Sequence, residues 1–275
     1  MVHPVLRTSD LKMRLVSAAI LAPLSVGFAF GGTWYFGVLV AVISCLALYE
    51  WLSMVGAGHA TLIPLMGLMV VSLITIISGS FLVSILLLLM ISFLFLVLST
   101  TVNPKNAWIA LGIVYIGMPC MSLVWLRTNE PYGFESVLMV LSIVWATDVG
   151  AFVVGSILGG PKLAPRVSPL KTWSGAVGGV ICGVSIGVLM GLLLGLSPIR
   201  TAFIAFFGIC VCLSVFGQLG DLFESVLKRK FNVKNSGVVI PGHGGVLDRI
   251  DSLLFVAPSA ACIALIRGDG GALWR

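Results

Sequence analysis

Long uninterrupted apolar runs constrain this chain more than any other feature of its sequence. Of the 275 residues, 59% are apolar and only 9% are charged, whereas soluble domains carry about 25% charged residues. About 20 apolar residues are needed to cross the roughly 30 Å of hydrocarbon in a bilayer. The sequence therefore predicts an integral membrane protein, and the few polar stretches between the runs become the candidate sites.

The apolar runs predict an all-α fold, a polytopic membrane bundle of about nine transmembrane helices. Strands are not expected, because the runs are long and lack the ten-residue alternation of an outer-membrane barrel. We place the helices near residues 15–31, 34–54, 61–78, 80–99, 107–126, 136–158, 174–196, 201–220 and 252–267.

Glycine is abundant in the seventh predicted helix, at positions 175, 178, 179, 183, 187 and 191. Small residues let helix backbones approach closely within lipid. We therefore expect this helix to pack deep in the bundle.

The basic residues predict the orientation of the chain in the membrane. With the N-terminus in the cytoplasm, twelve of the 16 Lys and Arg residues fall inside and four outside, which is a positive-inside bias. The inside set is 7, 12, 14, 105, 162, 166, 171, 228, 229, 230, 234 and 249. The net charge of +6 therefore needs no nucleic-acid partner, and none is expected. The two long non-helical stretches, 159–173 and about 230–251, lie on the cytoplasmic side.

Acidic residues within the apolar runs are candidates for function. Asp148 lies near the middle of a predicted helix, where an ionisable group costs at least about 2.5 kcal/mol and usually faces a polar cavity or a partner. A buried hydrogen bond between helices is the alternative. Glu50, beside Trp51 near a helix end, fits an interfacial position as well as a functional one.

A polar stripe emerges from the eighth predicted helix in the stretch GQLGDLFESVLKRK. Asp221, Glu224, Ser225 and Lys228 are spaced i, i+3, i+4 and i+7 and share one helix face. Gln218 extends that face inward. Such a stripe predicts a wet pocket or a subunit contact rather than a lipid-facing surface.

The stretch IPGHGGVLDRIDS places Asp248 and Asp251 where the last helix begins. Capping of that helix is one interpretation. The glycines before them leave backbone amides free to approach a phosphate. Asp221 and Asp248 can meet at the cytoplasmic face, and carboxylates beside basic groups suit Mg²⁺ carrying a polyphosphate. The loop GGPKLAPRVSPLKTWSG adds cations and hydroxyls without an acid, for anion binding or for topology alone.

The stretch from Ser225 to Asp251, SVLKRKFNVKNSGVVIPGHGGVLDRID, closely resembles the long signature of the phosphatidate cytidylyltransferases, also called CDP-diacylglycerol synthases. The segments SPLKTWSG, DVGAF and GQLGDLFES are similar to motifs of the same family in order and spacing. The motifs cover residues 148–252. The resemblance implies N-terminal membrane helices over 1–133 and catalytic membrane helices with the motif loops over 134–275.

The resemblance implies transfer of CMP from CTP to phosphatidic acid, giving CDP-diacylglycerol and pyrophosphate in phospholipid biosynthesis. It implies Mg²⁺ held by Asp221 and Asp248, and it allows a second, monovalent cation such as K⁺. Lys228 and Arg249 join these two acids as the catalytic set. The substrate-binding set is Ser168, Lys171, Thr172, Ser225, Arg229, His243, Gly244, Gly245, Asp251 and Asp148.

The resemblance also implies a homodimer in the inner membrane with its active site facing the cytoplasm. Two positions depart from the family pattern, since Asn235 and Ser174 stand where the family usually has acids. Two rival functions are a CTP-dependent polyprenol or phytol kinase and a membrane transporter with Asp148 at a midplane site. The full signature favours the cytidylyltransferase, and no internal repeat supports the transporter.

Overall fold

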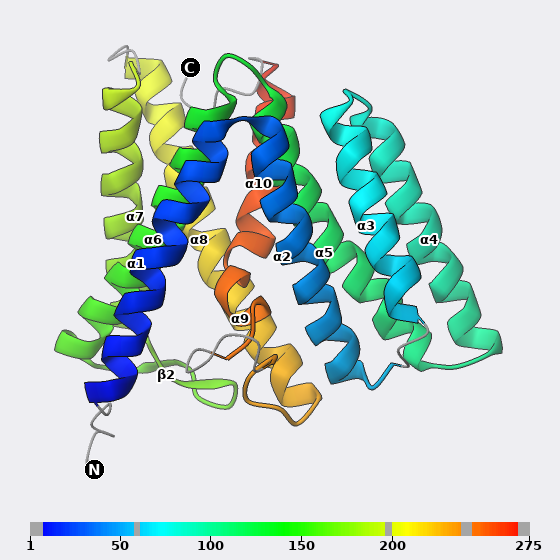
Figure 1. Ribbon diagram of the computed structural model, residues 1–275. Helices are drawn as coiled ribbons and strands as arrows, with labels where there is room; N and C mark the ends of the chain where they lie inside the picture. The colour runs from blue at the N-terminus through cyan, green and yellow to red at the C-terminus, as the bar shows by residue number, and fades with distance from the viewer. Residues whose placement is uncertain (1–7, 58–60, 196–199, 238–243, 269–275) are drawn as a thin grey trace.

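The computed structural model describes residues 8–57, 61–195, 200–237 and 244–268, and these are almost entirely helical (Figure 1). The helices are α1 (Thr8–Gly31), α2 (Thr33–Val55), α3 (Leu62–Ile77), α4 (Phe81–Thr101), α5 (Lys105–Thr128), α6 (Gly133–Leu158), α7 (Trp173–Leu193), α8 (Arg200–Lys230), α9 (Leu247–Ile250) and α10 (Leu253–Arg267). The prediction of a polytopic helical membrane protein is confirmed for this part of the chain.

Six of the described helices are long and apolar enough to cross a membrane: α2, α4, α5, α6, α7 and α8. Residues 19–31 of α1, together with α3 and α10, form shorter apolar helices. At about 1.5 Å per residue, the 16 residues of α3 extend about 24 Å, less than the hydrocarbon thickness. The count of nine membrane-crossing helices therefore stays a prediction.

Two helix boundaries differ from those expected. Helix α8 continues ten residues past the predicted end at 220, because Phe223 and Leu227 keep an apolar face on this polar stretch. The Phe223 ring packs 5.4 Å from the rings of Tyr115 and Phe255. The expected last helix, 252–267, is preceded by the short α9, and the chain turns at Asp251 before α10 begins.

The predicted non-helical stretch 159–173 contains a small antiparallel hairpin. Strand β1 (Lys162–Ala164) pairs with β2 (Ser168–Thr172), with Lys162 opposite Thr172 and Ala164 opposite Ser168. The expectation that the chain has no strands holds for the membrane helices but is wrong for this loop.

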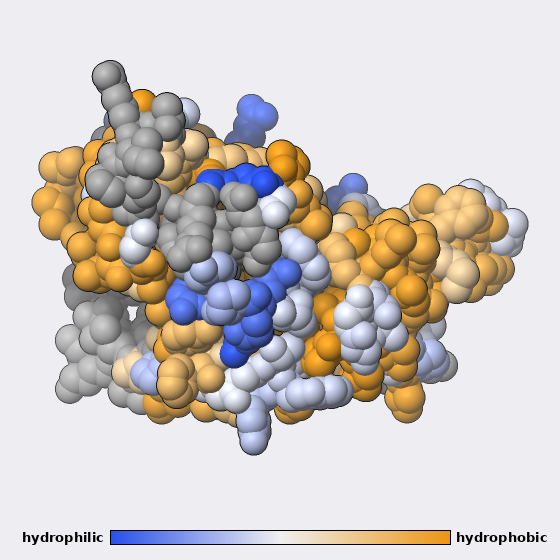
Figure 2. Space-filling model, turned by 90° about the horizontal axis from the view of Figure 1, so that it is seen from above, coloured by the Kyte–Doolittle hydropathy of each residue, from blue (hydrophilic) through white to orange (hydrophobic). Residues whose placement is uncertain are grey.

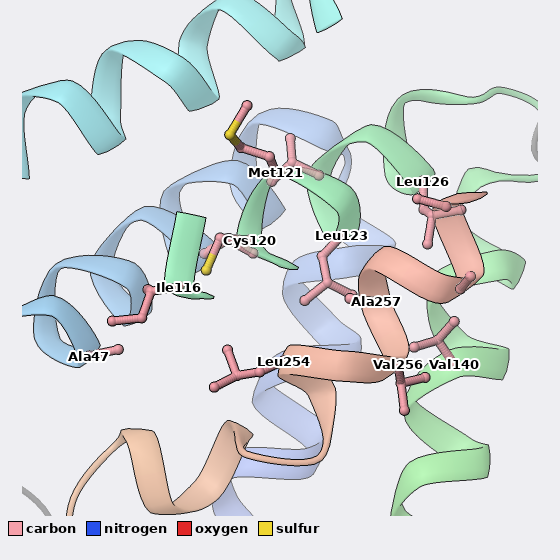
Figure 3. Packing of buried hydrophobic residues seen from close by; sticks show 14 of the residues in the cluster. Ala47, Ile116, Cys120, Met121, Leu123, Leu126, Val140, Leu254, Val256 and Ala257 are labelled. Atoms are coloured by element: carbon pink, nitrogen blue, oxygen red, sulfur yellow. The ribbon is translucent and has the colours of Figure 1, made fainter. Parts of the chain in front are cut away.

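Helix α5 lies at the centre of the bundle. Of the residues in its apolar 18-residue stretch, 72% are buried inside the protein, against 33% for the corresponding stretch of α7. Figure 3 shows Ile116, Cys120 and Leu123 of α5 packed near Leu254 and Ala257 of α10. This core joins the N-terminal helices to the last helix, and so to the loop that precedes it.

The glycines of α7 bring it into close contact with α6. A Cβ added to Gly175 would lie 2.7 Å from the carbonyl oxygen of Ala151, and one added to Gly179 would lie 2.8 Å from that of Thr147. The close approach is confirmed, but the expected deep position is wrong. Val177 and Leu193 are exposed, and α7 lies at the edge of the bundle (Figure 1).

Polar elements gather at one end of the bundle. The start of α5, the hairpin and the end of α8, which carry Lys105, Lys171 and Lys228, lie at this end (Figure 1), as the charge bias predicts. Figure 2 views the opposite end, where a hydrophilic group is surrounded by apolar residues.

The α6–α7 contact predicts opposite effects for two glycine substitutions. At Gly183 a Cβ would overlap the Thr147 hydroxyl and lie 3.0 Å from that of Ser214, whereas at Gly208 it would meet nothing within 4 Å. We expect Gly183→Ala to cost about 1–3 kcal/mol through overpacking. Gly208→Ala should stabilise α8 by about 0.5–1 kcal/mol. Thermal unfolding in detergent checks both, and equal melting temperatures for the two variants would contradict the packing described.

Candidate active site

The hairpin is fixed against the end of α8 by two contacts. Lys171 Nζ lies 2.5 Å from Asp221 Oδ2. Arg229 Nε donates a hydrogen bond to the carbonyl oxygen of Val167 at 3.3 Å. The predicted substrate loop and the end of α8 are therefore in direct contact.

The end of the hairpin is also the start of α7. Thr172 is buried, and its Oγ1 accepts a hydrogen bond from the Gly175 N–H at 3.1 Å, as an N-cap residue does. Ser174 Oγ donates to the carbonyl oxygen of Gly159. Thr172 and Ser174 thus close this loop onto the α6–α7 pair, while contact between Thr172 and a substrate stays a prediction.

Lys228 links α8 to the segment around α9. Its Nζ lies 2.9 Å from Glu224 Oε2 and 2.7 Å from Asp248 Oδ1. Glu224 is fully buried, so this cation compensates a carboxylate that has no access to water. Removing Lys228 would leave two largely buried acids without a compensating cation.

Asp248 also organises the backbone before α9. Its Oδ2 accepts hydrogen bonds from the N–H and Oγ of Ser236, both at 3.0 Å, and from the Gly245 N–H at 2.8 Å. Burial alone would raise the pKa of Asp248, but Lys228 and these N–H donors hold its pKa below the usual range. Asp248 is therefore a charged anchor for the segment between α8 and α9, whose described residues include Ser236, Gly237 and 244–246 and which is called the loop below.

A surplus of acidic groups surrounds Asp251. Burial raises the pKa of Asp251 well above its usual range, and the charges of Asp221, Glu224 and Asp148 raise it further. Ser252 joins two of these acids, because its Oγ donates to Asp148 Oδ1 at 3.2 Å and its N–H donates to Asp251 Oδ1 at 2.7 Å. Four carboxyl groups thus come together from α6, α8 and the α9–α10 turn.

An apolar cavity of about 740 Å³ ends at this acidic group. Its walls come from α1, α2, α5 and α6, with Leu21, Phe36, Ile43, Leu123 and Trp145 among them, and its polar end is lined by Asp148, Asp248, Arg249 and Asp251. Cavities of about 300–1,000 Å³ are typical of small-ligand sites. The shape suits a ligand with an apolar part and an anionic or cationic head.

Comparison with known proteins shows the family of this chain. The family model described as the cytidylyltransferase family matches residues 12–266. The chain belongs to this family. A phosphatidate cytidylyltransferase of Brucella suis biovar 1 (strain 1330) is 36% identical over 259 residues, which are 90% of this chain and 91% of the relative. One from Bacillus subtilis (strain 168) is 35% identical over 260 residues, covering 90% and 96% respectively.

Membership of the cytidylyltransferase family directs attention to the predicted metal ligands. Asp221 and Asp248 lie in the same polar region but contact different lysines, Lys171 and Lys228. In the described ranges, no three Asp, Glu, His or Cys side chains are grouped as ligands of a metal ion. The assignment of both acids to a metal stays a prediction.

The other predicted site residues come from α6, the hairpin, α8 and the segment around α9. Asp148, Asp251 and Arg249 line the cavity end, and Ser168 and Ser225 are half-buried in β2 and α8. Gly244 adopts a φ of 84°, which favours glycine. His243 lies outside the described residues.

Sequence reasoning assigned no role to Ser236 and Ser252, which connect this site, and left Glu50 open between an interfacial and a functional position. Ser236 and Ser252 each contact carboxyl groups from distant segments. Glu50 is buried and accepts hydrogen bonds from the segment before α9. The signal for Glu50 was present, since an acid within an apolar run requires a partner, but the sequence does not name that partner.

The paired lysine predicts a particular dependence of stability on pH. The depressed pKa of Asp248 contributes stability that is present above the ordinary aspartate pKa of about 4 and is lost as pH falls through the depressed value. In Lys228→Met this contribution is absent and two acids lose their cation. We expect the variant to be less stable near pH 7, and the difference from the parent to shrink as the pH falls below about 4, through the depressed pKa of Asp248. Melting temperatures across this range check it, with Lys230→Met, an exposed lysine of the same helix, as the control. A difference independent of pH would contradict the pairing.

Proposed function

We propose that this protein transfers CMP from CTP to phosphatidic acid, giving CDP-diacylglycerol and pyrophosphate for phospholipid synthesis. The observation that carries the proposal is the apolar cavity that ends among charged groups, because a lipid with a phosphate head needs both surfaces. The name of the relatives, phosphatidate cytidylyltransferase, supports the same substrates. A polyprenol kinase or a transporter has no comparable support.

The reaction joins two anions. A phosphate oxygen of phosphatidic acid attacks the α-phosphorus of CTP, a new phosphorus–oxygen bond forms, and the bond to the β-phosphate breaks to release pyrophosphate. Catalysis of such a step consists chiefly of positioning and of neutralising negative charge. Cationic groups that could bind the phosphates come from Lys171, Lys228, Arg229 and Arg249.

The acidic group fits a divalent cation in its charge. Asp221, Glu224 and Asp148 together raise the pKa of Asp251, so an additional positive charge there would be stabilising. We propose that Asp221 and Asp248 hold Mg²⁺, with Asp148 and Asp251 beside them, and that a monovalent cation such as K⁺ accompanies it. When bound, Mg²⁺ would withdraw charge from the phosphates of CTP.

The lipid would enter from the bilayer and the nucleotide from the aqueous end. The outer face of α4 exposes Leu82, Leu86, Met90 and Phe93, as a lipid-facing helix does. The hairpin end, which is rich in basic residues, favours the cytoplasmic face of the inner membrane. A homodimer is proposed from the family resemblance.

The first test of the proposal is an assay of purified protein with labelled CTP, Mg²⁺ and phosphatidic acid in detergent. The parent should form a labelled CDP-lipid, and Asp221→Asn should abolish turnover with little loss of folded protein, since Asp221 lies at a partly exposed surface. Glu130→Gln, the same acid-to-amide change at a 63% exposed side chain, is the control. Loss of folded Asp221→Asn protein in proportion to its activity would instead indicate a structural role.

The position of Asp148 predicts its effect on the response to Mg²⁺. Asp148→Asn should keep the fold, because an amide can still accept the hydrogen bond from Ser252, but it removes a negative charge beside the proposed cation. We expect a lower rate and a higher Mg²⁺ midpoint in a titration at saturating CTP, and a larger loss for Asp148→Leu. A parental rate and midpoint in Asp148→Asn would leave Asp148 as a helix-to-helix hydrogen bond only.

A further inference from the structure

Glu50 connects the N-terminal helices to the segment that carries Asp248. It lies near the end of α2 and is only 1% exposed. Its Oε1 accepts a hydrogen bond from the Val246 N–H at 2.8 Å, and its Oε2 accepts from the Leu247 N–H at 2.9 Å and from Ser236 Oγ at 3.1 Å. Partners nearly two hundred positions away in the chain thus meet at one carboxyl group.

The loop has space for this carboxyl group because two of its residues are glycines. A Cβ added to Gly237 would lie 2.5 Å from Glu50 Oε1, and one added to Gly245 would overlap both Glu50 Oε2 and Ser236 Oγ. A side chain at either position would displace Glu50 or the loop. The second glycine of the His-Gly-Gly motif is therefore required by contact with α2.

Ser236 links Glu50 to Asp248. Its Oγ lies 3.1 Å from Glu50 Oε2 and 3.0 Å from Asp248 Oδ2, and its N–H donates to Asp248 Oδ2. A hydroxyl has one proton to donate, so Ser236 Oγ donates to one of the two carboxyl groups at a time, and both acceptors lie within hydrogen-bond distance of it. Glu50 holds the loop near Ser236 and again at Val246 and Leu247, directly before Asp248.

We propose that Glu50 is a positioning residue for the transfer reaction: it fixes the backbone on both sides of the loop so that Asp248 and Arg249 stand at the polar end of the lipid cavity. The inference rests on the proposed function for its kinetic consequence. Glu50 is not among the residues that line the cavity, and the hydrogen bonds described for its carboxyl group go to the loop.

The experiment compares Glu50→Gln with Leu88→Ala. Glutamine keeps the size of the side chain, but its NH₂ group cannot accept a hydrogen bond, so at least one donor of the loop loses its acceptor. We expect kcat for the CDP-lipid to fall about tenfold to a hundredfold, with the KM for CTP within about threefold. Leu88 is equally buried, on α4, and Leu88→Ala should lower the melting temperature while the folded protein keeps the parental kcat.

A second measurement does not depend on activity. In hydrogen exchange, the amides of Val246 and Leu247 should exchange faster in Glu50→Gln than in the parent, and at the parental rate in Leu88→Ala. If the parent forms no CDP-lipid, the proposed function fails, whereas the exchange rates still test whether Glu50 fixes the loop. Parental kcat and parental protection of these amides in folded Glu50→Gln would overturn the inference.

A substitution in the loop itself tests the same contact if Glu50→Gln does not fold. Gly237→Ala presses on the carboxyl group without removing it, and we expect the same selective loss of kcat. The effects of Ser236→Ala and Glu50→Gln should sum to less than full additivity when the two are combined, because both changes remove the contact between Ser236 and Glu50. Full additivity of the two, or unchanged kcat in Gly237→Ala, would show that the loop is positioned by other contacts.

Discussion

The pairing of Lys228 with Glu224 and Asp248 is the interaction on which the site depends most. It places one cation between a fully buried acid of α8 and the acid that anchors the loop before α9. In a bundle made of apolar helices, neither carboxylate would be tolerated alone, since an uncompensated buried charge costs several kcal/mol. The same rule explains the contact of Lys171 with Asp221. Charge compensation therefore determines which segments meet at the polar end.

The helices position these charges by two different kinds of packing. Helix α5 fills the centre with large side chains and contacts α2 and α10, whereas α7 approaches α6 through glycines. The hairpin connects α6 to α7, so the close α6–α7 contact limits where Lys171 can lie. Thr172 and Ser174 then close the base of the hairpin. The basic loop is thus supported by rigid elements on both sides.

Much of this arrangement could be predicted from the sequence, because the signals are local. Apolar run length gave the helical membrane fold, and the spacing of Asp221, Glu224 and Lys228 gave the polar face of α8. The depth of α7 could not be predicted, since glycines indicate a close contact but not how many sides of a helix are covered. The partner of Glu50 was equally inaccessible, because the Val246 and Leu247 N–H groups that it binds exist in every residue except proline and leave no mark in a sequence.

The glycines that face Glu50 also have a consequence for how this protein can change over evolutionary time. Space at positions 237 and 245 is taken up by a carboxyl group from α2, so the two sides of the contact fit only as a set. A related sequence with a larger residue at 245 would need shorter residues at 50 and 236, whereas a sequence without the acid would lose the reason for the glycine at 237. Substitutions at these distant positions should therefore appear together across the family, as a correlated pair that joins the two halves of the chain.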